Sequence, residues 1–212
     1  VTLLDMADDG DTHEKRSARA HKGIDTQKKR KGFVHPKFVE NISAGNTTDD
    51  LEKLTECDWV VEAIFEDLDA KRSLYDAVAP HLNDRAILSS NTSTIPLAEL
   101  TAQLSDDLAS RFAITHFFNP PRVMRLVEIV EGEKTSKDTL KVLNAAAEQQ
   151  LGKVVVDCRD TPGFIANRLG CFWLGAGAEL AMEQGVSYEL ADAVFSKPFG
   201  IPRTGVFGLL DY

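Results

Sequence analysis

One imidazole and one carboxylate stand in two neighbouring apolar runs of the sequence. His116 lies in the strand-like run "FAITHFF" (112–118), and Glu128 lies in "LVEIV" (126–130). Two prolines follow His116 and stop the first strand, because proline cannot donate to a sheet ladder. An imidazole can remove a hydroxyl proton as hydride leaves the same carbon, and a fixed carboxylate can orient the imidazolium that results. This pair could therefore support the oxidation of an alcohol.

The same two residues also have a purely structural explanation. An unpaired charge among aliphatic neighbours is costly, so Glu128 needs a partner, and His116 is the nearest candidate in the sequence. The alternative is a core histidine and an edge-strand glutamate that never meet. The residue pattern alone leaves both interpretations open.

Further polar residues stand where strands are expected to end. Asp5 ends "VTLLD"; in a dinucleotide-binding fold such an acid binds a ribose 2′-hydroxyl, whereas elsewhere it caps a helix or lies in a turn. Asn91 and Ser93 end "AILSSNTS", where an open α/β sheet binds ligands, although a turn with a helix cap uses the same residue types. Asn167 interrupts "TPGFIANRLGCFWL" and must find a hydrogen-bond partner, either in a ligand or in a neighbouring loop.

Strand-like and helix-like stretches alternate along residues 1–158. Runs rich in Val and Ile predict strands, and helical periodicity predicts helices between them. This alternation, with near-continuous apolar strands, predicts an α/β domain with a mainly parallel sheet that is covered on both faces. We expect strands at 1–5, 37–43, 58–64, 86–93, 112–118, 126–132 and 153–158, and helices at 14–31, 51–56, 66–82 and 136–152, the last ended by Gly152.

After Cys158 the pattern is helical, so residues 159–212 are expected to begin a second, all-α domain. Thr161 and Pro162 have the types favoured at a helix N-cap and at the first helical position. The apolar stretch 163–182 is interrupted by polar residues and therefore predicts a buried helix and not a membrane span.

The composition is that of a soluble globular protein, with 43% hydrophobic and 27% charged residues. A net charge of −9 argues against a general nucleic-acid binder. The basic stretch 15–31 is either a solvated helix face or an attractor of phosphates such as those of coenzyme A. Three cysteines form no metal-binding spacing and no even disulfide set, which favours a reducing, cytoplasm-like compartment. Val1 lies inside a strand-like run, so no targeting signal can be read and a longer protein is expected.

Four motifs follow one another along the chain: "VVEAIFEDLDAKRSLY", "SSNTSTIPLAEL", "HFFNPPRVMRLVEIV" and "DTPGFIANRL". Together they resemble the L-3-hydroxyacyl-CoA dehydrogenase family, and "FGIPRTGVFGLLDY" looks like that family's second domain. The resemblance implies a doubly wound, Rossmann-type NAD-binding domain at 1–158 without its first strand and glycine loop. It implies the beginning of a C-terminal helical substrate and dimerisation domain at 159–212. The implied reaction is the NAD-dependent oxidation of an L-3-hydroxyacyl-CoA to the 3-ketoacyl-CoA, in fatty-acid β-oxidation or related acyl-CoA metabolism.

The resemblance also implies roles for individual residues. His116 is the implied catalytic base, and Glu128 is its carboxylate partner. Ser93 and Asn167 are implied to bind the substrate's 3-oxygen and help to place His116, with Asn119 in the same pocket. The residues implied on the cofactor side are Asp5, which binds ribose and favours NAD over NADP, Glu66 and Lys71 near the nicotinamide ribose, and Asn91 with Ser89.

The family resemblance implies an acyl-CoA substrate and a homodimer formed through the helical domain, and it allows an enoyl-CoA hydratase domain fused upstream. We expect no metal, nucleic-acid or membrane partner, and a location in the bacterial cytoplasm or an organelle matrix. Two other functions stay open at this point. A related dehydrogenase would act on a free hydroxy acid, and a non-catalytic domain would only bind a nucleotide or coenzyme A.

Overall fold

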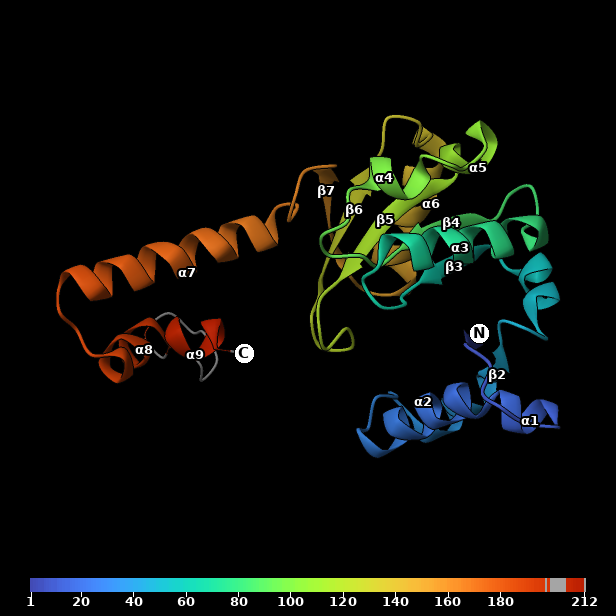
Figure 1. Cartoon of the computed structure of the whole chain (residues 1–212), viewed down its shortest axis with the longest axis horizontal. Helices are drawn as coiled ribbons and strands as arrows, with labels where there is room; N and C mark the ends of the chain where they lie inside the picture. Colours follow the sequence, from blue (N-terminus) through green and yellow to red (C-terminus); the bar gives the residue numbers. More distant parts are fainter. Residues whose placement is uncertain (197, 199–204, 212) are drawn as a thin grey trace. The chain divides into compact units, whose positions relative to one another are not determined.

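The computed structural model describes residues 1–196, 198 and 205–211. The chain divides into two compact units, Val1–Asp160 and Thr161–Tyr212 (Figure 1). Part of the segment "FGIPRTGVFGLLDY", residues 199–204 and 212, lies outside the described residues.

The first unit contains two sheets. Strands β1 (Thr2–Asp5) and β2 (Ser43–Asn46) form a parallel pair. Five further strands are β3 (Trp59–Glu62), β4 (Ile87–Ser90), β5 (Phe112–Phe117), β6 (Leu126–Glu131) and β7 (Val154–Arg159). They form one sheet in chain order, in which only the β5–β6 pair is antiparallel. The predicted α/β class with a mainly parallel sheet is therefore confirmed.

The separation into two ladders follows from the topology of doubly wound sheets. Such a sheet has the order 3-2-1-4-5-6, so its first strand lies between the second and the fourth. In this order, β1 and β2 correspond to the second and third strands, and β3 corresponds to the fourth. The strand that would lie between β1 and β3 and join the two ladders is then the first strand. The two ladders thus agree with the predicted Rossmann-type sheet that lacks this strand.

Helices or helical turns connect the strands, except β5 and β6, which are joined by a turn. Asp67 caps α3 (Leu68–Val78) and Ser136 caps α6 (Lys137–Ala145), and each side chain accepts a hydrogen bond from an amide of the first turn. Gly152, with a φ of +64°, ends the helical stretch after α6, as predicted. The other helices of this unit are α1 (His13–Arg16), α2 (Ala18–Lys29), α4 (Leu97–Thr101) and α5 (Asp106–Ser110), with 3-10 turns at Pro36–Asn41, Leu51–Glu56 and Ala79–His81 and a π turn at Ala146–Gln150.

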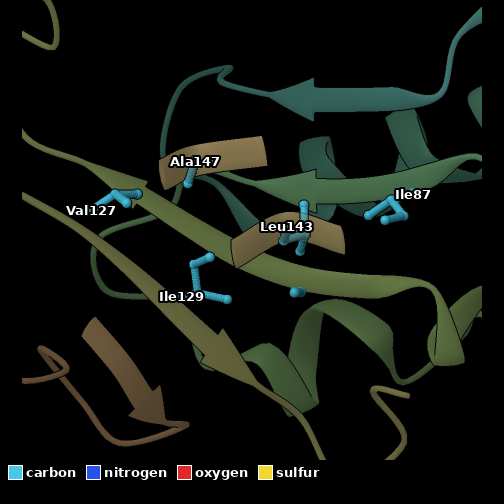
Figure 2. Close-up of a cluster of buried hydrophobic side chains, with 6 residues drawn as sticks. Ile87, Val127, Ile129, Leu143 and Ala147 are labelled. Carbon is cyan, nitrogen blue, oxygen red and sulfur yellow. The ribbon is translucent and has the colours of Figure 1, made fainter. Parts of the chain in front are cut away.

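One apolar cluster of the five-stranded sheet lies on the face that α6 covers. Ile87 of β4 and Val127 and Ile129 of β6 pack against Leu143 of α6 and Ala147 of the following π turn (Figure 2). All five side chains are buried. Because burying an aliphatic side chain contributes about 1.5–3 kcal/mol, this cluster holds α6 on the sheet.

The opposite face of the same sheet carries polar residues as well. Alternate residues of a strand point to opposite faces, so Glu128 lies on the other side of β6 from Val127 and Ile129. Helix α3 covers this second face (Figure 1), where Tyr75 meets Phe112 of β5 edge to face with ring centroids 5.4 Å apart. Helices therefore enclose the strands on both faces, which accounts for their near-continuous apolar character.

One predicted strand is wrong. The sequence predicts a strand at 37–43, but Pro36–Asn41 form a 3-10 helix and the strand begins only at Ser43. Proline is suited to the first helical turn because its φ is already helical and it has no amide hydrogen to lose. The ring of His35 also accepts a hydrogen bond from the amide of Lys37, which favours the helical start.

The second unit is helical in its described part. Its helices are α7 (Ala166–Glu183), α8 (Tyr188–Ser196) and α9 (Phe207–Leu210). Trp173 of α7 meets Phe195 of α8 edge to face, at 5.7 Å between ring centroids. Asp192 of α8 accepts hydrogen bonds from two amides at the beginning of α9. These contacts hold the three helices together.

Two expectations for α7 are wrong. Thr161 and Pro162 do not begin it, because the helix starts at Ala166 after an intervening turn. It is also not a buried helix: only three small residues are buried, whereas Phe172 is 75% exposed. The short α8 and α9 cover only one face of α7, which carries Trp173 and small residues such as Gly177. No helix in the described part of the chain is long and apolar enough to cross a membrane.

Candidate active site

Three parallel strands bring most of the candidate residues to one edge of the five-stranded sheet. Because β3, β4 and β5 run in the same direction, their carboxyl ends meet at that edge. Glu62 ends β3, residues 91–93 follow β4, and His116 lies next to the last residue of β5. Open α/β sheets bind their ligands outside this edge. The topology therefore places these residues where a ligand site is expected.

His116 and Glu128 are brought into contact. The antiparallel register of β5 and β6 places them directly opposite each other. Nδ1 of His116 lies 2.7 Å from Oε2 of Glu128, and the two residues are 4% and 1% exposed. The structural alternative, in which the two side chains never meet, therefore does not describe this chain.

Ser93 contacts the other nitrogen of the imidazole. Its Oγ lies 3.0 Å from Nε2 of His116. A carboxylate can only accept hydrogen bonds, so Nδ1 of the neutral ring carries the hydrogen that faces Glu128, and Nε2 is left as an acceptor. The Ser93 hydroxyl then donates to Nε2. The three side chains form a row in which Nε2 is the atom able to take up a proton.

Glu66 holds the loop that carries Ser93. Its Oε1 accepts hydrogen bonds from the hydroxyl of Thr92, from the amides of Ser93 and Thr94 at 3.1 Å each, and from the hydroxyl of Thr94 at 2.9 Å. Burial acts to raise the pKa of Glu66, but these bonds and the charge of Lys71 outweigh it and lower the pKa to about 2. A charged Glu66 therefore fixes this loop at neutral pH.

Sequence reasoning missed a second buried carboxylate at this edge, Glu62. It is 4% exposed and accepts hydrogen bonds of 2.6–2.8 Å from Lys71 Nζ, the Ile64 amide and the hydroxyls of Tyr75 and Ser90. Burial and the nearby Glu62 raise the pKa of Tyr75. The available signal was an acid inside the apolar run "WVVEAI", the same pattern that singles out the acid of "LVEIV".

The other residues expected on the cofactor side have structural partners. Oδ1 of Asn91 accepts a hydrogen bond from the amide of Phe117 at 2.9 Å and so joins the ends of β4 and β5. Ser89 is fully buried between Trp59 Nε1, at 2.8 Å, and Thr115 Oγ1, at 2.9 Å. These contacts stabilise the sheet, and the cofactor roles expected for Asn91 and Ser89 stay predictions.

The turn after β5 contributes Phe118 and Asn119. The ring of Phe118 tilts against the imidazole, with centroids 4.5 Å apart, whereas Asn119 is exposed. Lys153 donates to the carbonyls of Pro121 and Met124 and thereby fixes the turn. Burial lowers the pKa of this lysine. A substrate contact of Asn119 stays a prediction.

Asp5 lies in the two-stranded sheet, and the basic stretch 15–31 lies in the helices between its two strands. Asp5 is exposed at the carboxyl end of β1, where an acid of a dinucleotide-binding fold reaches ribose hydroxyls. The basic stretch forms most of α1 and α2, and ion pairs with acids offset part of its charge, which favours a solvated face. These pairs are Lys15–Asp11, Arg16–Asp49, Arg19–Asp8 and Lys28–Asp25.

Asn167 lies in the first turn of α7, in the second unit. Its expected contact with the substrate's 3-oxygen therefore stays a prediction. Among the described residues there is no cluster of His, Cys, Asp and Glu that could hold a metal ion.

Comparison with known families divides the chain in two. Residues 1–161 match the model of the 3-hydroxyacyl-CoA dehydrogenase NAD binding domain, and residues 163–212 match the model of the C-terminal domain of the same family. Among solved structures, the (S)-3-hydroxybutyryl-CoA dehydrogenase PaaH1 from Ralstonia eutropha is similar, with a TM-score of 0.74 and 27% identity, over 95% of this chain and 69% of that one.

Curated relatives agree with these matches. The mitochondrial hydroxyacyl-coenzyme A dehydrogenase of Homo sapiens is 34% identical over 224 residues, which cover 100% of this chain and 68% of that protein. A protein of Rickettsia prowazekii (strain Madrid E) named "Putative fatty acid oxidation complex trifunctional enzyme" is 41% identical over 212 residues, and this chain spans 29% of its length. The chain belongs to the 3-hydroxyacyl-CoA dehydrogenase family, as its NAD-binding domain followed by part of its C-terminal domain.

Proposed function

We propose that the protein oxidises an L-3-hydroxyacyl-CoA to the 3-ketoacyl-CoA with NAD, in fatty-acid β-oxidation or related acyl-CoA metabolism. The observation that carries the proposal is the row of Ser93, His116 and Glu128 at the carboxyl edge of the NAD-binding domain. This row provides a hydroxyl donor, a proton acceptor and an orienting carboxylate. Membership of the family supports the substrate class.

His116 is the proposed base. Its Nε2 accepts the proton of the substrate's 3-hydroxyl, while Glu128 keeps its hydrogen bond to Nδ1 and stabilises the imidazolium. Once Nε2 is protonated, the hydroxyl of Ser93 turns to the substrate oxygen, which lies beside both groups. Asn167 is proposed to bind the same oxygen, and Asn119 to line the pocket. Holding these groups in register with the substrate is an effect of proximity and orientation.

A bound NAD would supply the hydride acceptor for the oxidation at C3, and residues of this chain would hold it. The exposed carboxylate of Asp5 is proposed to hold the adenosine ribose, because it stands at the carboxyl end of β1, where an acid of a dinucleotide-binding fold reaches ribose hydroxyls. Glu66, whose side chain is 38% exposed, is the proposed contact of the nicotinamide ribose. The half-buried Asn91 is proposed to lie on the same side of the site.

The test is to follow NADH consumption by the full-length protein with acetoacetyl-CoA and with free acetoacetate. Turnover with the thioester alone is expected. Equal turnover with the free acid would favour a hydroxy-acid dehydrogenase, and NADH binding without turnover on either substrate would favour a non-catalytic binding domain.

A fused domain and a location for the protein are proposed from its relatives, and a homodimer is proposed from its exposed apolar residues. One relative is named as a trifunctional enzyme of fatty acid oxidation, which supports a fused enoyl-CoA hydratase domain as a partner. Exposed apolar residues of α7, among them Phe172, support a homodimer formed through the helical domain. Bacterial and mitochondrial relatives support a bacterial cytoplasm or an organelle matrix as the location. Light scattering of the full-length protein tests the dimer.

A further inference from the structure

Helix α4 has no capping side chain of its own. Its N-cap residue is Pro96, which offers no side-chain acceptor to the amides of the first turn. The carboxylate of Asp160 takes this place instead. Its Oδ1 accepts a hydrogen bond from the amide of Leu97 at 2.8 Å, and its Oδ2 accepts one from the amide of Ala98 at 3.0 Å. The cap of α4 therefore comes from a residue that is 62 positions away from Ala98 in the sequence.

Asp160 does not cap a helix that follows it. It stands directly after β7, and the next helix, α7, begins only at Ala166. Both of its carboxylate oxygens are used by α4. The acid at the end of β7 thus fixes the beginning of a distant helix, and what lies beside that beginning becomes informative.

The first turn of α4 adjoins the loop that carries Ser93. Three residues separate Ser93 from Leu97. This connection is stiff, because proline fixes the φ of Pro96, here at −58°, and restricts the backbone of Ile95 before it. The amide of Ile95 also donates to the hydroxyl of Thr92 at 3.0 Å. A shift of the first turn of α4 is therefore carried to Ser93.

Other contacts hold the body of α4 and not its beginning. Leu100 is fully buried, and the guanidinium of Arg72 donates to the carbonyl of Glu99 at 3.1 and 2.7 Å. Neither of these contacts reaches the amides of the first turn. The end of the helix next to the loop is thus the part that Asp160 controls.

Two carboxylates hold this loop from its two ends. Glu66 accepts hydrogen bonds from residues 92–94, and Asp160 holds the turn that follows. Between these two anchors, the hydroxyl of Ser93 lies 3.0 Å from Nε2 of His116. A displacement of about 1 Å in such an arrangement can lower a rate by about 10²-fold.

We propose that Asp160 is a positioning residue, which caps α4 and thereby holds the loop in the place that keeps the Ser93 hydroxyl against His116. The inference rests on the proposed function, whose site it deepens. The alternative is a helix cap that contributes only to stability. Loss of such a cap would weaken the fold without an effect on Ser93, so the two roles can be distinguished.

The test compares variants of the full-length protein. Asp160→Ala removes both acceptors; Asp160→Asn, which keeps the size and one acceptor oxygen, replaces it if the alanine variant does not fold. Ser136→Ala is the matched control, because it removes a different helix cap, the hydroxyl that accepts from the amide of Thr139 in α6. The readouts are kcat with acetoacetyl-CoA, urea unfolding, and amide hydrogen exchange of residues 92–98.

For Asp160→Ala we expect kcat to fall by about tenfold, because the Ser93 hydroxyl is no longer held in place. The amides of Leu97 and Ala98 should exchange faster because their acceptor is lost, and those of Ser93 and Thr94 should exchange faster because the loop is looser. Ser136→Ala should lower the free energy of unfolding as the loss of a cap does, but it should leave kcat and exchange at 92–98 unchanged.

A double-mutant cycle tests the route through Ser93. In a Ser93→Ala background the hydroxyl to be positioned is absent, so adding Asp160→Ala should lower kcat further by less than about twofold. Two residues that act through one contact give such non-additive effects, whereas independent structural losses add.

Two results would overturn the proposal. Faster exchange confined to Leu97 and Ala98, with kcat within about twofold of the wild type, would leave Asp160 as a cap only. A full tenfold loss in the Ser93→Ala background, of about the size expected in the wild type, would mean that Asp160 acts by another route. Failure of the proposed function is seen separately, as a wild-type protein that does not turn over acetoacetyl-CoA. In that case the exchange of the Ser93 and Thr94 amides still decides whether Asp160 positions the loop.

Discussion

The carboxyl edge of the five-stranded sheet and helix α7 differ in the kinds of side chain that they bury and expose. At the sheet edge, charged residues such as Lys71 and Glu128 are buried, and each has its partner in the same unit. On α7, apolar residues such as Leu169 and Phe172 are 64% and 75% exposed. A buried charge must be satisfied from within, whereas an exposed apolar side chain gains stability only when another surface covers it. The buried charges of the sheet edge thus have their partners within the same unit, whereas the exposed apolar side chains of α7 are not covered by the other helices of theirs.

The largest expected effect is that of His116→Ala at the sheet edge. Turnover of acetoacetyl-CoA by the full-length protein should fall by about 10²–10⁴-fold, because the proton acceptor is lost. NADH affinity, measured by calorimetric titration, should stay unchanged. Near-wild-type turnover would show that the base lies elsewhere.

Glu128→Gln should have the next largest effect. The amide can still accept from Nδ1 of His116, but it no longer stabilises the imidazolium, so kcat should fall by about 10²-fold. Glu131→Gln, at an exposed position of the same strand, is the control and should leave kcat unchanged. Equal kcat in the two variants would contradict the role of Glu128.

Two side-chain substitutions, one in each region, compare how much the two regions contribute to the free energy of unfolding. Ile129→Ala in the core cluster should lower the free energy of unfolding by about 2–5 kcal/mol, since it leaves a cavity among buried side chains. Phe172→Ser on α7 should change it by no more than about 0.5 kcal/mol in this 212-residue chain, because the ring is mostly in solvent. Urea unfolding of the two variants provides the measurement. A cost for Phe172→Ser close to that of Ile129→Ala would mean that α7 is covered in solution.

The smallest expected effect is a pH dependence from Glu66. Its pKa is lowered in the folded chain to about 2 from 4.5, so its stabilising contribution is fully present above about pH 4.5 and is lost as the pH falls through about 2. Solvent screening weakens the contribution, because the side chain is 38% exposed. The stability difference between the wild type and Glu66→Gln should therefore shrink as urea titrations move from pH 7 to pH 2. A constant difference over this range would contradict the lowered pKa.

Local sequence patterns predicted much of the fold. Runs of Val, Ile and Phe located six of the seven strands among the described residues, and the capped, periodic stretches located α3 and α6. The strand expected at 37–43 failed because Pro36 and the His35 ring favour a 3-10 start, a local preference that outweighs the β-branched residues. The expected burial of α7 failed because apolar composition says what a helix can bury and not whether a surface is present to cover it.

Less of the candidate site than of the fold could be predicted from the sequence. His116 and Glu128 could be proposed as a pair, but only the β5–β6 register shows that they are direct neighbours. Glu62 was missed because its donors come from three separate elements, a loop, α3 and β4. Outside the candidate site, Asp160 is likewise bound to residues distant in the sequence: its carboxylate accepts hydrogen bonds from the amides of Leu97 and Ala98 at the beginning of α4, across 63 and 62 positions of sequence. Long-range partners of this kind leave no local pattern.

The antiparallel pairing of β5 and β6 also bears on which insertions and deletions the chain can tolerate. The distance between His116 and Glu128 is fixed by the ladder and not by the turn that joins the strands. Residues could therefore be added to or removed from that turn without separating the pair, as long as the ladder keeps its register. A slip of one residue within the ladder would instead turn one of the two side chains to the opposite face of the sheet. The turn is thus a place where loops of different length and chemistry can be grafted beside an unchanged acid–base pair.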